Sequence, residues 1–503
     1  MFYDVAICKP GWPTRPPYTI GLMTTKLKDT TMSILISGAT IIDAVSKAPI
    51  EGKSLWVEGE RIKAIVSSDD SRAISPARTI DARGKYIIPG LMDANVHLLL
   101  DARMENLVRH WGRYEDLIVE AAQVALKGGL TTVFDTWGPR TPLMAVRDKI
   151  NAGQLTGSRI FCAGNIIGLD GPFSPDFFAK ALEFASGAMA ERINAIWAEN
   201  VGSNLGWLTP EQVAEEVRTY IGKGIDFVKY ASSEHRMDPT AFLAFSPRVQ
   251  KAMVAEAHRA GITAQSHTSS VEGLWAAIEA GCDIIQHCNI SGPIAIPEAT
   301  LQLLVERNTA AVVFAFTEVR CKLILEKGDK FTQNLFATQD TNLRNIMKAG
   351  ATLLMAGDAG LIAPEMSSDP AMKNSWIAAG EDNLAELGQG HFAWLKAMEE
   401  KGLPAMEGLK AATRNIAVAY QKDKDLGTLE PGKIADMVIL DKNPLQSAAN
   451  YRSIHMVLKD GAVVDRAALP MNPLLTKPME PPSDEVLAYR ARRAAGASRY
   501  PCC

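Results

Sequence analysis

A strand–helix unit recurs through the middle of the chain, and this repetition limits the possible folds more than any other feature. Segments such as AAQVALKGGLTTVFDTW, VQKAMVAEAHRAGITAQSH and NLRNIMKAGATLLMAGDAG pass from a helix, through a glycine, into an apolar strand. Nearly continuous apolar strands are typical of parallel strands buried on both faces. Eight strands are predicted, and they end near residues 97, 135, 165, 229, 267, 287, 316 and 358. Eight such units predict an α/β protein with a (β/α)8 TIM-type barrel. A doubly wound sheet is the runner-up, but no G-x-G-x-x-G turn supports it.

Short strands with tight turns flank this repeat on both sides. Residues 32–88 contain SILISGATIID and KSLWVEGERIKAIV, and residues 421–468 contain LGTLEPGKIADMVILDKNPL. Such alternation with glycine-containing turns predicts antiparallel β structure. We expect one small β-sandwich domain built from both segments, with the barrel spanning residues 89–420. Residues 1–31 are predicted to be a loosely held extension before a candidate start at Met32, and residues 469–503 a C-terminal tail.

The composition is that of an ordinary soluble globular protein. The 503 residues include 53 basic and 57 acidic side chains, and 47% of the chain is hydrophobic. This balance gives no reason to expect nucleic acid or a membrane surface as a partner. Seven cysteines without a C-x-x-C spacing argue against a disulfide framework. No apolar run reaches the length of a membrane span, and the first residues do not resemble a signal peptide, so a cytoplasmic location is expected.

Polar side chains stand at the carboxyl ends of the predicted strands, where barrels of this kind place their active sites. One histidine after a strand is more often structural than a ligand, but a whole set on one rim predicts a metal site. Asn95 and His97 are two residues apart on one strand, so both side chains point to the same face. The predicted metal-site residues are Asn95, His97, Lys229, His267, His287 and Asp358.

Several motifs resemble those of the metal-dependent amidohydrolase superfamily: PGLMDANVH, GIDFVKYAS, SHTSS, IIQHCN, MAGDAG and LEPGKIADMVILD. The resemblance covers residues from about 33 to 466. It implies metal ligation by His97, Lys229, His267, His287 and Asp358. In many members the lysine is carboxylated and bridges two ions, and members commonly assemble, so a homo-oligomer is expected. Zinc is the ion expected, because imidazole suits it.

Asn95 departs from the family motif, in which a histidine occupies this position. The N-x-H variant resembles a subgroup, the phenylurea hydrolases and the related molinate (thiocarbamate) hydrolase. An amide oxygen is a poorer zinc ligand than imidazole, so Asn95 predicts one ion, or two with one loosely bound. The alternative is that Asn95 only hydrogen-bonds a ligand or a water beside the metal.

The resemblance implies hydrolysis of a small-molecule substrate at a C–N bond. We expect an N-aryl-N′,N′-dialkylurea, or a related carbamate or thiocarbamate, to be attacked by metal-bound hydroxide, with Asp358 as general base and acid. The alternative within the enzyme class is a prolidase-like dipeptidase acting on N-acyl amino acids. A non-catalytic scaffold is a third reading, but a scaffold would be expected to lose its ligands wholesale.

Further side chains near the strand ends are candidates for the pocket. Aromatic residues there serve as pocket wall or as barrel filling with similar frequency. His235 and Arg236 follow the fourth strand and could contact substrate, although a surface position is expected for His235. Cys288 is expected to be a small buried residue. The aromatic candidates are Phe134, Trp137, Tyr230, Phe314 and Phe316.

Overall fold

The computed structural model describes residues 33–67, 69–99, 104–177, 185–234, 241–328, 330–364 and 382–477. The predicted extension over residues 1–31 lies outside this part of the chain, as do His235, Arg236 and most of the predicted tail. No described helix is long and apolar enough to cross a membrane.

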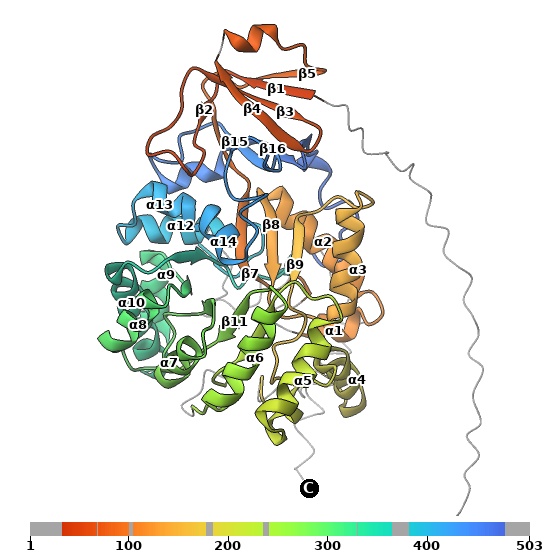
Figure 1. Ribbon diagram of the computed structural model, residues 1–503, viewed down its shortest axis with the longest axis vertical. Coiled ribbons are helices and arrows are strands. Elements are labelled where there is room, and N and C mark those ends of the chain that lie inside the picture. The colour runs from red at the N-terminus through yellow and green to blue at the C-terminus, as the bar shows by residue number, and fades with distance from the viewer. Residues whose placement is uncertain are drawn as a thin grey trace, which may run out of the picture.

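Eight parallel strands form the centre of the molecule and fall into two ladders (Figure 1). The three-stranded ladder contains β7 (Leu91–Val96), β8 (Leu130–Asp135) and β9 (Arg159–Cys162). The five-stranded ladder contains β10 (Val228–Ala231), β11 (Ala264–His267), β12 (Ile284–Gln286), β13 (Ala310–Val313) and β14 (Leu353–Met355). All eight strand ends lie within three residues of their predicted positions, so the predicted strand count is confirmed.

The two ladders meet through single parallel bridges rather than through a continuous set of backbone hydrogen bonds. Val96 bridges Ala359 beyond β14, and Ile167, beyond β9, bridges Tyr230 of β10. The described residues therefore show eight parallel strands in order, without one closed eight-stranded ladder.

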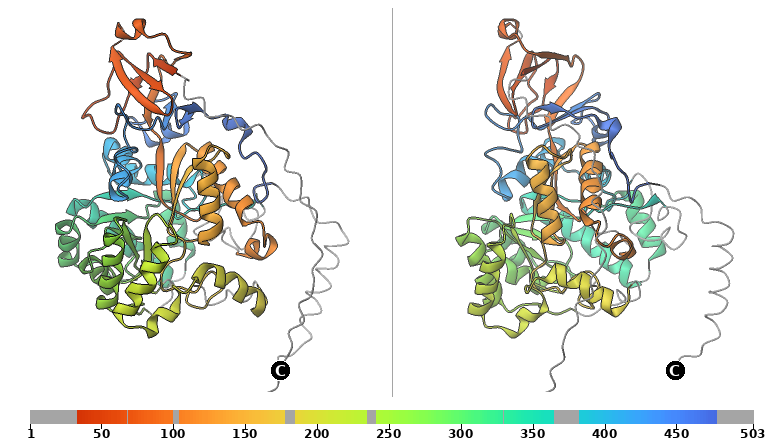
Figure 2. Two further views of the ribbon diagram at one scale, coloured as in Figure 1. Left: turned by 45° about the vertical axis from the view of Figure 1, so that its right-hand side comes forward. Right: turned by 90° about the vertical axis from the view of Figure 1, so that its right-hand side faces the viewer.

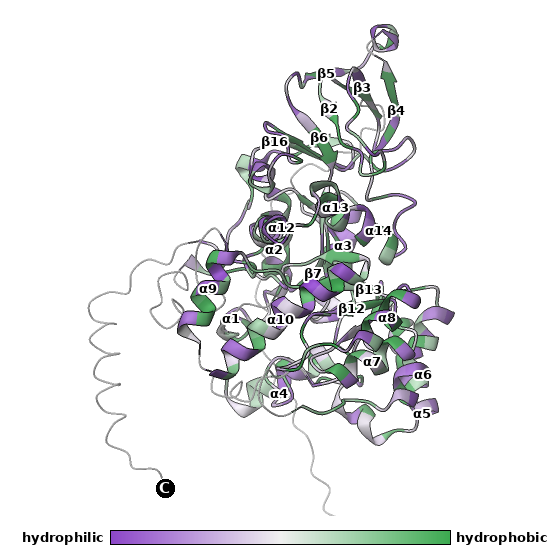
Figure 3. Ribbon diagram, turned by 90° about the vertical axis from the view of Figure 1, so that its left-hand side faces the viewer, coloured by the Kyte–Doolittle hydropathy of each residue, from purple (hydrophilic) through white to green (hydrophobic). Residues whose placement is uncertain are grey.

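Helices follow the strands and cover the outside of this arrangement. The helix ribbons in Figure 3 alternate between hydrophilic and hydrophobic residues, as expected for helices with one buried side. Helix α5 begins with a capping box, in which the Thr209 side chain accepts from the Gln212 backbone and Gln212 reciprocates. The main helices are α2 (Tyr114–Lys127), α3 (Arg140–Asn151), α4 (Gly187–Ala198), α5 (Pro210–Ile221), α6 (Pro247–Arg259), α7 (Val271–Glu279), α8 (Glu298–Glu306), α9 (Glu318–Lys327), α10 (Lys330–Ala349), α12 (Gly390–Glu400), α13 (Ala405–Ala411) and α14 (Arg414–Ala419).

Strands from the two ends of the chain lie together at one end of the molecule (Figures 1 and 2). One sheet has the order β4 (Arg61–Ser67), β3 (Lys53–Glu58), β1 (Ser33–Ser37), β5 (Arg78–Asp81). The other has the order β17 (Ala462–Val463), β16 (Ile454–Lys459), β15 (Met437–Leu440), β6 (Tyr86–Pro89), β2 (Thr40–Ile41). Because β6 pairs with β15, a strand from the N-terminal part of the chain is joined directly to one from the C-terminal part. Side chains of both sheets share one small apolar cluster, which includes Ile36, Leu55, Ile87, Met437 and Leu458.

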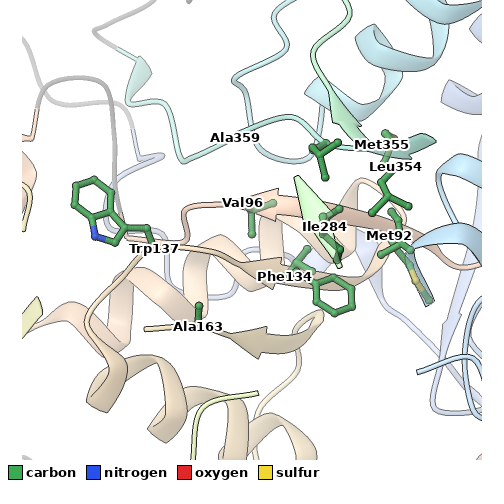
Figure 4. Close-up of a cluster of buried hydrophobic side chains, with 14 of the residues drawn as sticks. Met92, Val96, Phe134, Trp137, Ala163, Ile284, Leu354, Met355 and Ala359 are labelled. Atoms are coloured by element: carbon green, nitrogen blue, oxygen red, sulfur yellow. The ribbon is translucent and has the colours of Figure 1, made fainter. Parts of the chain in front are cut away.

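The larger apolar cluster fills the centre of the eight strands. Figure 4 shows Val96, Phe134 and Ile284 from β7, β8 and β12 gathered there, while Trp137 stands apart at the strand ends. Every residue of β7 and β8 is buried, which explains why their sequences carry no polar alternation. Gly90, which precedes β7, has no room for a side chain, because a Cβ there would overlap Thr131.

The last described residues, 469–477, are attached to helix α2 by hydrogen bonds to a buried carboxylate. Glu120 is 1% exposed. Its oxygens accept hydrogen bonds from the backbone amides of Leu474, Leu475 and Thr476 at 2.8–2.9 Å, and from the Thr476 hydroxyl at 2.5 Å. Since hydrogen bonds to a charged group are strong, this contact fixes the strap formed by residues 469–477.

Candidate active site

The carboxyl ends of the first and eighth parallel strands bring a histidine and an aspartate together. His97, directly after β7, places Nε2 at 3.0 Å from Oδ1 of Asp358, which follows β14. The His97 backbone amide also donates to the Ala359 carbonyl oxygen at 2.9 Å. Both predicted residues therefore lie in one site, held by main-chain and side-chain contacts.

Asn95 and Lys229 are linked through a residue that the sequence did not single out. Thr136, directly after β8, donates its hydroxyl proton to Oδ1 of Asn95. The same hydroxyl oxygen accepts a hydrogen bond from Nζ of Lys229 at 3.0 Å. All three side chains are buried, with Asn95 at 0% and Lys229 at 1% exposure. The site thus contains a continuous hydrogen-bond chain from Lys229 through Thr136 to Asn95.

His267 and His287 form the third part of the site. Their ring centroids are 5.0 Å apart, and His287 also lies edge-on to Phe314 at 4.7 Å. His287 and Asp358 both adopt left-handed backbone conformations, with φ of 54° and 49°. Such conformations are costly for residues other than glycine and occur often at functional sites.

Burial and nearby charge set the ionisation of these groups. Burial lowers the pKa of Lys229 to about 8, against the opposing pull of Asp358 and Asp135. Burial likewise lowers the pKa of His287 to about 4, so its imidazole is neutral at pH 7. Burial alone would raise the pKa of Asp358, but His287, His97 and Lys229 outweigh it and hold the pKa below its usual range. Asp358 is therefore ionised at neutral pH.

The donor set of the site suits a divalent ion of the first transition row. The Nδ1 atoms of His97 and His287 are buried and make no hydrogen bond within the described part of the chain. Neutral imidazole and carboxylate are common zinc ligands. As they stand, no three of the described His, Cys, Asp and Glu side chains have the geometry of a metal-binding group. Lys229, which is also a predicted ligand, is not one of these four residue types.

The aromatic candidates divide between the site and the core. Trp137 lies edge-on to His97, with ring centroids 6.3 Å apart, and packs on Phe177 at 4.2 Å. Its indole N–H donates to Oδ1 of Asn165 at 2.8 Å, which fixes the ring. Phe314 touches His287, as described above. In contrast, Phe134 stacks on Tyr420 at 3.8 Å inside the apolar centre.

The remaining described candidates are all buried. Tyr230 is fully buried, and Phe316 packs on Phe336 at 5.4 Å. Cys288 is buried, and burial raises the pKa of its thiol to about 12, in keeping with a small buried residue.

Three polar residues around the site, Thr136, Asp135 and Asp93, were not predicted from the sequence. Asp135 accepts from the Leu98 backbone amide at 2.8 Å, and burial raises its pKa to about 6. Asp93 accepts from the backbone amides of Asn95 and Gly357, and burial raises its pKa to about 8. Position alone could have identified Asp135 and Thr136, because both stand at the end of the second predicted strand.

Residues 86–464 match the Amidohydrolase family, in agreement with the parallel strands and the polar rim. The solved structure of molinate hydrolase is 35% identical, with a TM-score of 0.84 over 90% of this chain and 99% of that chain. Phenylurea hydrolase B is 34% identical, with a TM-score of 0.83 over 89% of this chain and 100% of that chain. The ochratoxinase of Aspergillus niger is 25% identical over 429 residues, which are 81% of this chain and 82% of that protein. The chain therefore belongs to the amidohydrolase family and is a hydrolase, and the predicted resemblance is confirmed.

Proposed function

We propose that this protein is a metal-dependent hydrolase that cleaves the C–N bond of N-aryl-N′,N′-dialkylureas or of a related carbamate or thiocarbamate. The observation that carries the proposal is the Asn95–x–His97 pair at the end of β7, in a chain 34–35% identical to molinate hydrolase and phenylurea hydrolase B. The substrates named for those two proteins are the source of the substrate class proposed here.

The proposed ligands are the five predicted family positions, with Asn95 beside them. A divalent ion, most simply zinc, would polarise a carbonyl group and lower the pKa of bound water. Lys229 would ligate as a carbamate formed from its neutral amine and carbon dioxide, because an ammonium group cannot bind a cation. The low pKa of Lys229 supports this step, since it favours the neutral amine. The proposed ligands are His97, Lys229, His267, His287 and Asp358.

The protein's own residues would handle the proton and the leaving group. Asp358 is ionised, so its carboxylate can take the proton of the attacking water and deliver it to the departing nitrogen. His97, in hydrogen-bond contact with Asp358, holds that carboxylate in place. A urea nitrogen leaves poorly as an anion, which makes this proton delivery a necessary part of the reaction.

The aromatic contacts support an aryl substituent on the substrate. Trp137 and Phe177 on one side, and Phe314 on the other, bring apolar rings against the site histidines. Apolar walls with a few convergent polar groups are typical of small-molecule sites.

We also propose that residues 89–420 form a (β/α)8 barrel and that residues 32–88 and 421–468 form one β-sandwich. The two ladders joined by single bridges, and the apolar cluster shared by the two end sheets, support this division. Assembly into a homo-oligomer and a cytoplasmic location remain predictions.

A substrate panel tests the proposed function. Metal-loaded and chelator-treated protein would each be incubated with a dimethyl aryl urea, a thiocarbamate and an N-acyl amino acid. Release of aryl amine only by the metal-loaded sample is expected. Cleavage of the acyl amino acid alone would refute the substrate class in favour of the dipeptidase alternative.

A further inference from the structure

The side-chain amide of Asn95 has a hydrogen-bonded oxygen and a buried nitrogen without a hydrogen-bond acceptor in the described part of the chain. Its oxygen accepts the proton of the Thr136 hydroxyl. Its nitrogen Nδ2 is buried and makes no hydrogen bond within the described part of the chain. Leaving a buried donor without an acceptor is costly, so this arrangement calls for a bound acceptor.

The chemistry of the hydrogen-bond chain fixes which end of the amide faces Thr136. An ammonium Nζ on Lys229 has only protons to offer, so Thr136 accepts from it. A carbamate on the same nitrogen keeps one N–H, while its delocalised lone pair accepts poorly. The neutral amine keeps two N–H groups, so Nζ can donate to Thr136 in all three forms of Lys229, which is the direction of the observed hydrogen bond. The single hydroxyl proton of Thr136 is then left for Asn95, and only the amide oxygen can accept it.

This polarity turns the amide nitrogen of Asn95 away from Thr136. Asn95 and Lys229 both hydrogen-bond Thr136, and Lys229 and His97 both lie close enough to Asp358 to lower its pKa. His97 is also in hydrogen-bond contact with Asp358. The Asn95 N–H groups therefore lie in the same buried site as the proposed proton carrier.

We infer that Asn95 donates a hydrogen bond from Nδ2 to the carbonyl oxygen of the substrate, and that Thr136 is the positioning residue that fixes the amide for this task. The inference rests on the proposed function. Attack on the carbonyl carbon places negative charge on that oxygen, and a fixed donor stabilises the charge as it develops. Asparagine at this position thereby selects substrates with a carbonyl oxygen, which ureas, carbamates and amides share.

Zinc affinity and turnover of full-length variants separate a donor from a metal ligand. In Asn95→Ala, the zinc dissociation constant, measured by competition with a chromogenic chelator, is expected to stay within twofold of wild type. The value of kcat/KM for a dimethyl aryl urea is expected to fall about 100-fold, mainly in kcat. Asn95→Asp, which keeps the shape but loses the donor, is expected to be equally impaired.

Thr136 provides a matched pair of variants. Thr136→Val is expected to lose most of the same activity without loss of zinc, and Thr136→Ser to recover it to within about threefold. Zinc binding weakened tenfold or more in Asn95→Ala, or activity retained by Asn95→Asp, would overturn the inference. If wild type cleaves no carbonyl substrate, the proposed function fails, and the zinc affinity of Asn95→Ala still decides whether the asparagine is a ligand.

Discussion

His97 Nε2 lies 3.0 Å from Asp358 Oδ1, although the two residues are 261 positions apart in the chain. The contact joins the end of the first parallel strand to the end of the eighth, beside the single bridge between Val96 and Ala359. The site therefore depends on the first and eighth strands lying side by side. Asp358, the proposed proton carrier, is therefore held by His97, which is also a proposed metal ligand.

Replacing Asp358 by asparagine is expected to lower kcat about 1,000-fold at saturating zinc, because general acid–base catalysis contributes on the order of 10²–10⁴. The size and polarity of the side chain are nearly kept. Steady-state kinetics, with thermal unfolding as the control for folding, measure the effect. A kcat within tenfold of wild type would exclude Asp358 as the proton carrier.

Replacing Lys229 by methionine is expected to abolish activity yet stabilise the metal-free protein at pH 7. Burial lowers the folded pKa of Lys229 from 10.5 to about 8, so the unfolded chain holds this proton more tightly. The stability of metal-free wild type should therefore rise as pH increases from about 8 to 10.5. Below pH 8 the variant gains on the order of 3 kcal/mol.

Denaturant unfolding of chelator-treated Lys229→Met and wild type at pH 7 and pH 10.5 checks this prediction. The difference between the two proteins should be large at pH 7 and small at pH 10.5. A variant less stable than wild type at pH 7 would contradict the origin assigned to the shift.

Acid should destabilise the protein through His391, a buried residue of α12 far from the rim. Nε2 lies 3.0 Å from the Gly128 carbonyl oxygen, and burial lowers the pKa to about 3 despite that bond. Between pH 6.5 and about 3 the unfolded chain binds a proton that the folded protein does not. The free energy of unfolding should therefore fall as pH drops, by about 1.4 kcal/mol per unit from this group.

His391→Gln provides the comparison, since its amide can still donate to Gly128 but does not titrate. Urea unfolding at several pH values from 7 to 4 should give a shallower slope for the variant. Parallel slopes would show that His391 is not the group responsible.

Trp137→Ala is expected to raise KM for an aryl urea about tenfold, while a trialkyl urea is affected much less. The Trp137 ring is fixed by Asn165 and lies against His97, so it can pack on an aryl substituent. Trp137→Phe, which keeps an aromatic surface, is the control. Equal losses for aryl and alkyl ureas would mean that Trp137 supports the site without contacting the aryl group.

Glu120→Gln is expected to loosen the strap of residues 469–477 and to lower the free energy of unfolding by about 2 kcal/mol. The amide has one acceptor oxygen where the carboxylate has two, and four hydrogen bonds converge there. Limited proteolysis, followed by mass spectrometry, should show faster cleavage near the strap in the variant. Unchanged cleavage would indicate that other contacts hold the segment.

The strand ends could be predicted from the sequence because the buried strands are continuous apolar runs and most of the preceding helices stop near a glycine. It predicted the rim residues because parallel strands end at one edge, which brings residues such as Asn95 and Asp358 to the same side. It could not predict the chain through Thr136, since a threonine after a strand is common and the contact depends on the three-dimensional position of Lys229.

Glu120 was missed for a related reason. A glutamate on a helix is normally solvated, and only the return of the chain some 354 positions later buries this one.

An anomalous-difference map from crystals of the zinc-loaded protein, collected at the zinc absorption edge, would show directly whether the rim side chains hold a metal ion. A peak is expected at about 2.0–2.3 Å from ligand atoms of His97, His267, His287, Asp358 or carboxylated Lys229, with Asn95 Oδ1 still facing Thr136. A map with no peak among these side chains would contradict the proposed metal centre. A peak bound directly by Oδ1 of Asn95 would contradict the donor role inferred for that residue.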